Sequence, residues 1–221
     1  MFAYCLNNPV VLEDISGTVA RVSISANSQI DETPWRDFSL GGGGVPAGRR
    51  FIQRAYIRDQ NATGVGELKL GWSTVSHGGC GVVAAYNALI TLGSSESFES
   101  VLRYFNQKSD RLVAFGFLGM LPSDIVEYFE CKGYHVFVTS DLDGMNACSQ
   151  TADACIMWYA WPETYAGIFD AFGAHFVHYR KTAYNYVAYN VGITGTSSFG
   201  KPSSFGGLDN CFYAVGIFIY K

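Results

Sequence analysis

The sequence predicts an α+β fold, because its helical segments come before most of its strands. Apolar residues at helical spacing occupy the middle of the chain, and segments dense in Val, Ile, Tyr, Phe and Trp dominate its last third. This clustering is typical of N-terminal helices packed on a C-terminal antiparallel sheet, whereas regular alternation would indicate a parallel sheet. With 221 residues, 48% of them hydrophobic and 15% charged, the chain is long and apolar enough to bury such a core.

Three helices are predicted in the middle of the chain. Cys80–Leu92 is rich in Ala and other helix-compatible residues, and a glycine follows it, as is common at helix ends. The second helix is capped by Ser94 or Ser97 and carries apolar residues at helical spacing. The third opens at Pro122, a favoured first residue of a helix, and ends at Gly133.

Strand-like segments fill most of the rest of the chain. Tyr134–Thr139 follows the third helix, and a short helix to about Cys148 is expected after it. Four further strands are expected from their content of β-branched and aromatic residues: Ala154–Trp161, Ala174–Lys181, Tyr184–Val191 and Cys211–Tyr220. Only a short turn separates the second and third of these four, so we expect them to form a hairpin.

The chain is expected to divide near residue 70. Residues 1–70 are polar and irregular and are predicted to form an N-terminal extension or a small β-rich region, in which Val19–Ile24 follows strand alternation only loosely. Gly41–Gly44 predicts a loop, because four glycines lose too much backbone entropy in a helix or a strand. Residues 71–221 hold all the segments described above and are predicted to form the main domain.

Charge and hydropathy argue against two classes of partner. The formal net charge is -4, from 15 basic and 19 acidic residues, so no general attraction for nucleic acid is expected. The longest apolar stretches, Val82–Leu92 and Cys211–Tyr220, reach about half the length of a membrane-spanning helix. Because the first residues also lack the pattern of a secretory signal, we expect a soluble, cytoplasmic protein without membrane insertion.

The cysteines indicate neither a disulfide framework nor a metal centre. The six cysteines include no C-x-x-C pair and no spacing typical of metal ligands. In a chain of this length, their even number is weak evidence of bridging. We therefore expect free thiols and a protein that needs no metal or organic cofactor.

One segment, Ser76–Gly81, carries a pattern that points to chemistry. Its cysteine, Cys80, stands at the predicted start of an apolar helix, where unpaired amides and the helix dipole stabilise a thiolate. The glycines on both sides leave room for a carbonyl group to approach the sulfur and for amides to bind the resulting oxyanion. Cys80 is therefore the candidate nucleophile.

Histidine is the side chain best suited to assist such a thiol at neutral pH. The chain has four histidines: His77, His135, His175 and His178. His175 is the candidate, because Gly173 and Ala174 before it allow close approach. His178 lies three positions further along the same predicted strand, so only one of the two can face the helix. His178 is expected to be directed to solvent, together with Arg180, and it stays the alternative.

A third polar side chain is expected to orient the imidazole. The strand after the histidine supplies Asn185 and Asn190, and a side-chain amide at either position can hold the ring as the third member of a triad does. Asn190, late in its strand, is the candidate.

These segments resemble the papain-like cysteine peptidases, and within them the bacterial C39-like branch. The resemblance rests on Gly79–Leu89, Gly173–Val177 and Tyr186–Asn190, which place a cysteine, a histidine and an Asp or Asn in the family's order along the chain. It covers about residues 71–191. It implies a papain-like fold for the main domain, with the three candidates as nucleophile, general base and acid, and orienting residue.

The sequence departs from this family at the oxyanion site. Papain-like enzymes place a glutamine shortly before the cysteine, at the position of Thr74 here, with Ser73 and Ser76 nearby. These three residues and the Cys80 amide are the candidate oxyanion donors. The leading interpretation is a thiol hydrolase that acts on a peptide or protein substrate through an acyl-enzyme. Two others stay open: an acyltransferase using the same thioester, and a non-catalytic binding or structural protein on a papain-like fold.

Overall fold

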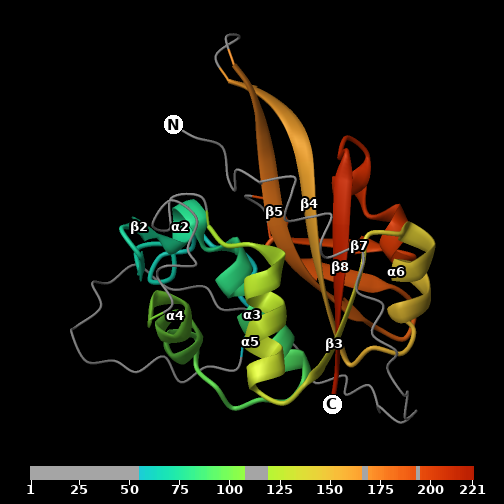
Figure 1. The fold of residues 1–221 in the computed structure, drawn as a ribbon, viewed down its shortest axis with the longest axis horizontal. Helices are drawn as coiled ribbons and strands as arrows, with labels where there is room; N and C mark the ends of the chain where they lie inside the picture. The colour runs from blue at the N-terminus through green and yellow to red at the C-terminus, as the bar shows by residue number, and fades with distance from the viewer. Residues whose placement is uncertain (1–54, 108–118, 166–168, 193–194) are drawn as a thin grey trace.

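The computed structural model of the chain describes residues 55–107, 119–165, 169–192 and 195–221. The predicted strand Val19–Ile24 and the predicted loop Gly41–Gly44 lie outside these residues. In the described part, an antiparallel six-stranded sheet stands beside a group of helices, which confirms the predicted α+β class (Figure 1).

The main helices fall where the apolar periodicity predicts them. The described part contains the α-helices α2 (Val75–Gly78), α3 (Cys80–Thr91), α4 (Phe98–Gln107), α5 (Pro122–Cys131) and α6 (Leu142–Cys148), and the 3-10 turns η3 (Pro202–Ser204) and η4 (Gly206–Leu208). Pro122 is the first residue of α5, and Asp141 caps α6 by accepting a hydrogen bond from the Gly144 amide at 2.6 Å. The single-turn helix α2 carries no sequence pattern that predicts it.

The strands form two antiparallel sheets. The small one pairs β1 (Lys69–Leu70) with β2 (Ser73–Thr74). The large one has the order β3-β8-β4-β5-β6-β7 and is built from β3 (His135–Thr139), β4 (Ala154–Tyr165), β5 (Phe169–Lys181), β6 (Tyr186–Tyr189), β7 (Thr196–Phe199) and β8 (Tyr213–Tyr220). The predicted hairpin is the pair β5 and β6. The sequence does not predict strand β7, because three of its four residues are Thr or Ser.

Strands β4 and β5 form a long ribbon that projects beyond the rest of the sheet (Figure 1). They pair from Cys155 opposite Tyr179 to Tyr165 opposite Phe169. By contrast, β6 pairs with β5 only between His178 and Lys181. His175 therefore lies on β5 just beyond the stretch that pairs with β6.

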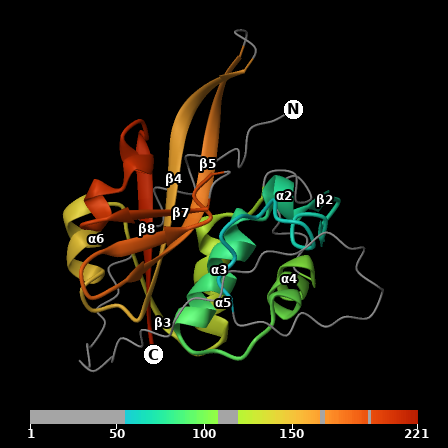
Figure 2. The same ribbon diagram turned by 180° about the vertical axis from the view of Figure 1, so that it is seen from behind.

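Both faces of the large sheet are covered. Helix α3 is apolar on almost every side and packs on a face that carries Ile156, Trp158 and Phe176. The opposite face packs against Met145 of α6 and Phe205 next to η4. Figures 1 and 2 show α3 and α5 on one side of the sheet and α6 on the other. Because side chains alternate along a strand, even-numbered residues of β4 and β5 face α3, and odd-numbered residues face the other cluster.

Residues 55–70, which belong to the expected N-terminal extension, pack on this helix-and-sheet unit. The backbone of Ile57 makes two hydrogen bonds with the side-chain amide of Asn87 in α3, at 2.8 and 2.9 Å. Tyr56 stacks on Tyr189 of β6, with ring centroids 4.5 Å apart. The segment thus bridges α3 and β6, which brings Gln60 to the end of β6.

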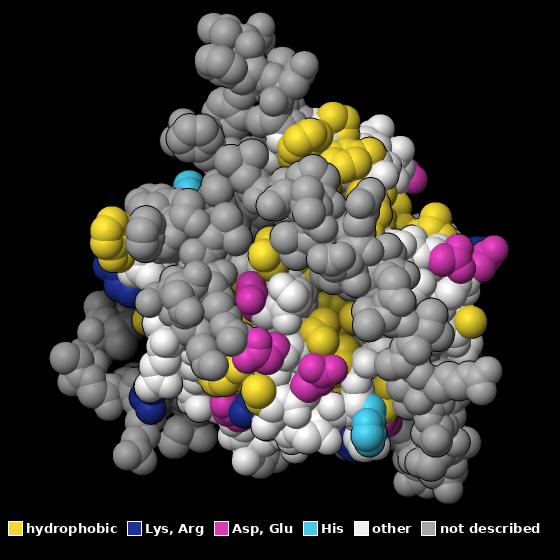
Figure 3. Space-filling view, in the orientation of Figure 1, with side chains coloured by type: hydrophobic (Ala, Val, Ile, Leu, Met, Phe, Trp, Pro, Cys, Tyr) yellow, Lys and Arg dark blue, Asp and Glu magenta, His cyan; other side chains and the backbone are white. Residues whose placement is uncertain are grey.

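The described surface carries charges of both signs. On the face drawn in Figure 3, acidic side chains gather near the middle, and most basic ones lie singly toward the margins. No helix of the described residues combines the length and the apolar content that crossing a membrane requires.

Candidate active site

Cys80 is the first residue of α3, as the sequence predicts. Helix α2 ends at Gly78, and Gly79 alone joins it to α3. A side chain at Gly79 would place its Cβ 2.6 Å from the Val75 carbonyl oxygen, so the tight connection requires glycine. This connection places the sulfur at the N-terminus of a 12-residue helix, where the helix dipole favours negative charge.

The structure brings His175 to Cys80. The His175 ring is hydrogen-bonded to the Cys80 thiol, and its Nε2 lies 2.5 Å from the backbone carbonyl oxygen of Asn190. A carbonyl oxygen can only accept, so Nε2 carries a proton and donates it. This bond leaves Nδ1 as the ring nitrogen available to the thiol, which is the tautomer a general base needs.

The environment of His175 favours its protonated form. Burial acts to lower the pKa of the imidazole, but the hydrogen bond to Cys80, the charge of that sulfur and the Asn190 carbonyl together raise it above the ordinary value. A charge on either group would therefore stabilise the opposite charge on the other.

Asn190 contacts the histidine through its backbone, whereas the sequence analysis expects its side chain to do so. The residue has φ of 65°, a left-handed conformation that asparagine tolerates better than most side chains. Its amide instead pairs with Gln60: Oδ1 accepts from the Gln60 backbone N–H at 2.8 Å, and Nδ2 donates to Gln60 Oε1 at 2.9 Å. The turn after β6 thus directs the carbonyl to His175 and the amide away from it.

The expectation that His178 faces solvent is wrong. The residue is fully buried on the sheet face that packs against α3, with its Nε2 2.7 Å from Thr91 Oγ1 and its Nδ1 donating to the Cys155 carbonyl oxygen at 2.8 Å. Burial lowers its pKa to about 3, although the bond to Cys155 opposes this shift and the charge of Arg180 adds to it. Alternation correctly predicts that the two histidines lie on opposite faces of the sheet. His178 is on the face that packs against α3, whereas His175, on the other face, contacts Cys80 at the N-terminus of this helix.

The two remaining histidines lie elsewhere. His77 is in α2, three residues before Cys80. His135 is exposed on β3, which is separated from β5 by β8 and β4.

The predicted oxyanion donors lie in the segment just before Cys80. Ser73 and Thr74 form β2, and Ser76 is in α2. The hydroxyl oxygens of Thr74 and Ser76 are 3.1 Å apart and hydrogen-bonded to each other. Their role toward an oxyanion stays a prediction.

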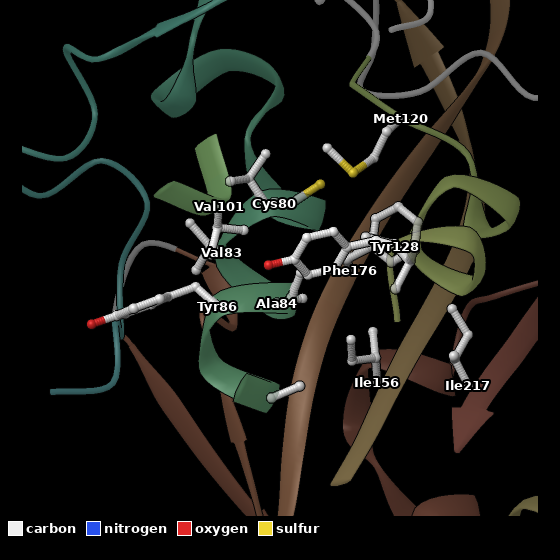
Figure 4. Close-up of a cluster of buried hydrophobic side chains, with 14 of the residues drawn as sticks. Cys80, Val83, Ala84, Tyr86, Val101, Met120, Tyr128, Ile156, Phe176 and Ile217 are labelled. Atoms are coloured by element: carbon white, nitrogen blue, oxygen red, sulfur yellow. The ribbon is translucent and has the colours of Figure 1, made fainter. Parts of the chain in front are cut away.

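Cys80 has no exposed surface. Met120, which precedes α5, lies beside it: Figure 4 shows the Cys80 sulfur and the Met120 thioether next to each other. A Cβ at Gly81, the second residue of α3, would come within 2.6 Å of the Met120 Cγ and Sδ atoms. Met120 therefore packs on the first turn of α3, beside the Cys80 sulfur.

Aromatic side chains flank His175 on its own face of the sheet. Tyr159, directly opposite His175 on β4, contacts the imidazole edge-on with ring centroids 6.1 Å apart. Trp161 lies over Gly173, where a Cβ would be 2.2 Å from the indole ring. Glycine at 173 is thus required for the indole to lie flat against β5 two residues before the histidine.

The described part of the chain contains no group of three or more His, Cys, Asp or Glu side chains that could hold a metal ion. Its five cysteines, Cys80, Cys131, Cys148, Cys155 and Cys211, are free thiols. No model of a known protein family matches the chain, and no curated protein matches it either. The geometry of Cys80, His175 and Asn190 is therefore the feature of the chain that bears on its function.

Gln60 is the residue of this site that the sequence analysis misses. It lies 20 positions before Cys80 and 130 before Asn190, in a stretch without periodicity or a recognisable motif. No local signal marks it, because its partners come together only in the folded chain.

Proposed function

We propose that the protein is a papain-like thiol hydrolase that cleaves a peptide or related amide through an acyl-enzyme intermediate on Cys80. One observation carries the proposal: a cysteine at a helix N-terminus is hydrogen-bonded to a histidine whose Nε2–H is held by a carbonyl oxygen. Nucleophile, base and orienting acceptor are the three parts that this chemistry requires.

The reaction would follow the order that these groups support. The Cys80 sulfur attacks the amide carbonyl carbon, its proton having passed to His175, and a carbon–sulfur bond forms. His175 then protonates the leaving amine as the carbon–nitrogen bond breaks. Water attacks the resulting thioester, giving its proton to His175, and the carbon–sulfur bond breaks to release the acid and restore the thiol. The backbone amide of Cys80 and its neighbours are the proposed oxyanion donors.

Burial of Cys80 favours a second candidate, acyl transfer to an amine. A sulfur without exposed surface is shielded from bulk water, so an amine bound at the site would compete well for the thioester. Adding a primary amine and analysing the products by mass spectrometry separates the two candidates, because hydrolysis gives an acid and transfer gives an amide.

Alkylation of the thiols tests whether Cys80 is activated. The full chain would be treated with iodoacetamide at pH 6.5, and the rate at Cys80 compared by peptide mapping with that at Cys131, an exposed free thiol of the same molecule. We expect Cys80 to react faster, and His175→Ala to remove that advantage, because a thiolate reacts and a thiol does not.

His135→Ala is the matched control, since His135 is exposed and lies on β3. A wild-type rate at Cys80 that is no higher than at Cys131, and that His175→Ala leaves unchanged, would contradict the hydrolase. It would favour the non-catalytic binding or structural protein.

A further inference from the structure

Gln60 joins the two sides of the candidate active site. Its Nε2 donates to the Ser76 carbonyl oxygen at 3.0 Å, in the helix just before Cys80. On the other side, its backbone N–H and its Oε1 hold both ends of the Asn190 amide, at 2.8 and 2.9 Å. Three hydrogen bonds thus connect the segment before the nucleophile with the turn whose carbonyl binds His175.

The two bonds between Gln60 and Asn190 are buried, and the bond to Ser76 is partly buried. Gln60 is 4% exposed and Asn190 is 1% exposed, so water does not readily replace the two bonds between them. A buried amide without a hydrogen-bond partner costs free energy. The folded protein therefore strongly favours the arrangement in which these bonds are formed.

The two reacting groups have no short connection along the chain. Cys80 is on α3 and His175 on β5, so their separation depends on how the helix packs against the strand. A thiol and an imidazole must be held within about 0.5 Å of the productive geometry for proton transfer. Buried hydrogen bonds between the segments that flank these two groups would meet this requirement.

We propose that Gln60 is a positioning residue that sets the placement of the His175 imidazole relative to the Cys80 thiol, an inference that rests on the function proposed above. Gln60 touches neither reacting atom. It acts through Ser76 on one side and through Asn190 on the other.

Two measurements on the full chain test this role. In Gln60→Ala, the Asn190 amide keeps its bond to the backbone N–H of residue 60 but loses the one to Oε1. The Asn190 carbonyl is then held less firmly, so the His175 Nε2–H should exchange with solvent roughly tenfold faster in nitrogen-15 NMR spectra. The iodoacetamide rate at Cys80 at pH 6.5 should fall by roughly the same factor, because losing one buried hydrogen bond shifts an equilibrium by about this much. Gln60→Met keeps the length of the side chain but loses both side-chain hydrogen bonds, so it should act in the same direction and covers the case in which Gln60→Ala does not fold.

Asn146→Ala is the matched control. Asn146 also uses its side-chain amide for two bonds to a distant segment, donating to Ser203 Oγ and accepting from the Ser203 N–H, both at 3.0 Å. Its loss should lower stability without changing the exchange of the His175 Nε2–H or the rate at Cys80.

The outcomes separate this inference from the function itself. Unchanged exchange and unchanged alkylation in both Gln60 variants would overturn the positioning role, whatever the wild-type reactivity. If wild-type Cys80 reacts no faster than Cys131 and His175→Ala leaves its rate unchanged, but exchange at His175 still speeds up in Gln60→Ala, the hydrolase fails and the positioning role stands.

Discussion

His175 donates its Nε2–H to the backbone carbonyl of Asn190, while the Asn190 side chain turns away to pair with Gln60. The orienting group is therefore a carbonyl, and the side chain serves to hold that carbonyl in place. A side-chain substitution at Asn190 cannot remove the acceptor directly. It can only loosen its position.

The backbone conformation of Asn190 predicts an order of stability for two variants. Both Asn190→Gly and Asn190→Ala lose the pairing with Gln60, but only alanine is strained at φ of 65°. We expect Asn190→Ala to be about 1 kcal/mol less stable than Asn190→Gly in urea unfolding. Asn87, inside α3, provides the control, because there glycine should be the less stable variant by about 1 kcal/mol. The same order at both positions would contradict the left-handed conformation.

The interaction between His175 and Cys80 predicts how His175 titrates. Interaction with Cys80 raises its pKa above the ordinary value against the opposing effect of burial. In Cys80→Ala, burial should prevail and move the pKa below 6.5. Titration of the ring proton resonances by NMR measures both values, with His178, which stays neutral above about pH 3, as the internal control. A His175 pKa that Cys80→Ala leaves unchanged would exclude the interaction.

The buried His178 predicts a loss of stability in mild acid. Its pKa falls from 6.5 to about 3 on folding, so between these two pH values the unfolded chain binds a proton at His178 and the folded chain does not. The stability that the neutral ring contributes is complete above pH 6.5 and declines as the pH falls toward 3, by at most about 1.4 kcal/mol per pH unit. Urea unfolding between pH 6 and 5 should show this slope in the wild type and a smaller one in His178→Asn, whose amide can still donate to Cys155. Equal slopes would contradict the prediction.

The packing of Met120 beside Cys80 predicts that shortening the Met120 side chain speeds the alkylation of Cys80. Met120→Ala removes atoms from the first turn of α3, so iodoacetamide should reach the sulfur several-fold faster, while stability falls by about 2–5 kcal/mol. Met145→Ala is the control, since Met145 is equally buried and its Cγ also packs close to a glycine, Gly216, away from the site. Faster reaction at Cys80 in both variants would indicate general loosening of the fold.

The close packing of Gly173 predicts a large effect from one methyl group. In Gly173→Ala, the new Cβ would stand 2.2 Å from the Trp161 indole, so the ring must move. We expect a loss of about 1–3 kcal/mol in unfolding free energy and a change in tryptophan fluorescence. Gly200→Ala, where no atom lies within 4 Å of the added Cβ, should show neither. An unchanged fluorescence spectrum in Gly173→Ala would mean that the indole does not lie there.

Much of the fold follows from local patterns. Helices α3, α4 and α5 have strong apolar periodicity or clear end signals, and the strands are dense in β-branched and aromatic residues, so their types could be predicted. Cys80 could be placed because a glycine-flanked cysteine before an apolar helix is a local signal. The face on which each histidine lies could not be predicted, because it depends on the register of β5 against its neighbours. No local sequence pattern marks Gln60, because its hydrogen-bond partners are distant in sequence.

The two histidines of β5 engage opposite ends of the same helix, His175 at Cys80 and His178 at Thr91. Adding or removing a single residue between them would turn one of the two rings to the other face of the sheet relative to its partner. The contact at Cys80 or the one at Thr91 would then be lost. Natural variants of this protein should therefore not differ in length between positions 175 and 178.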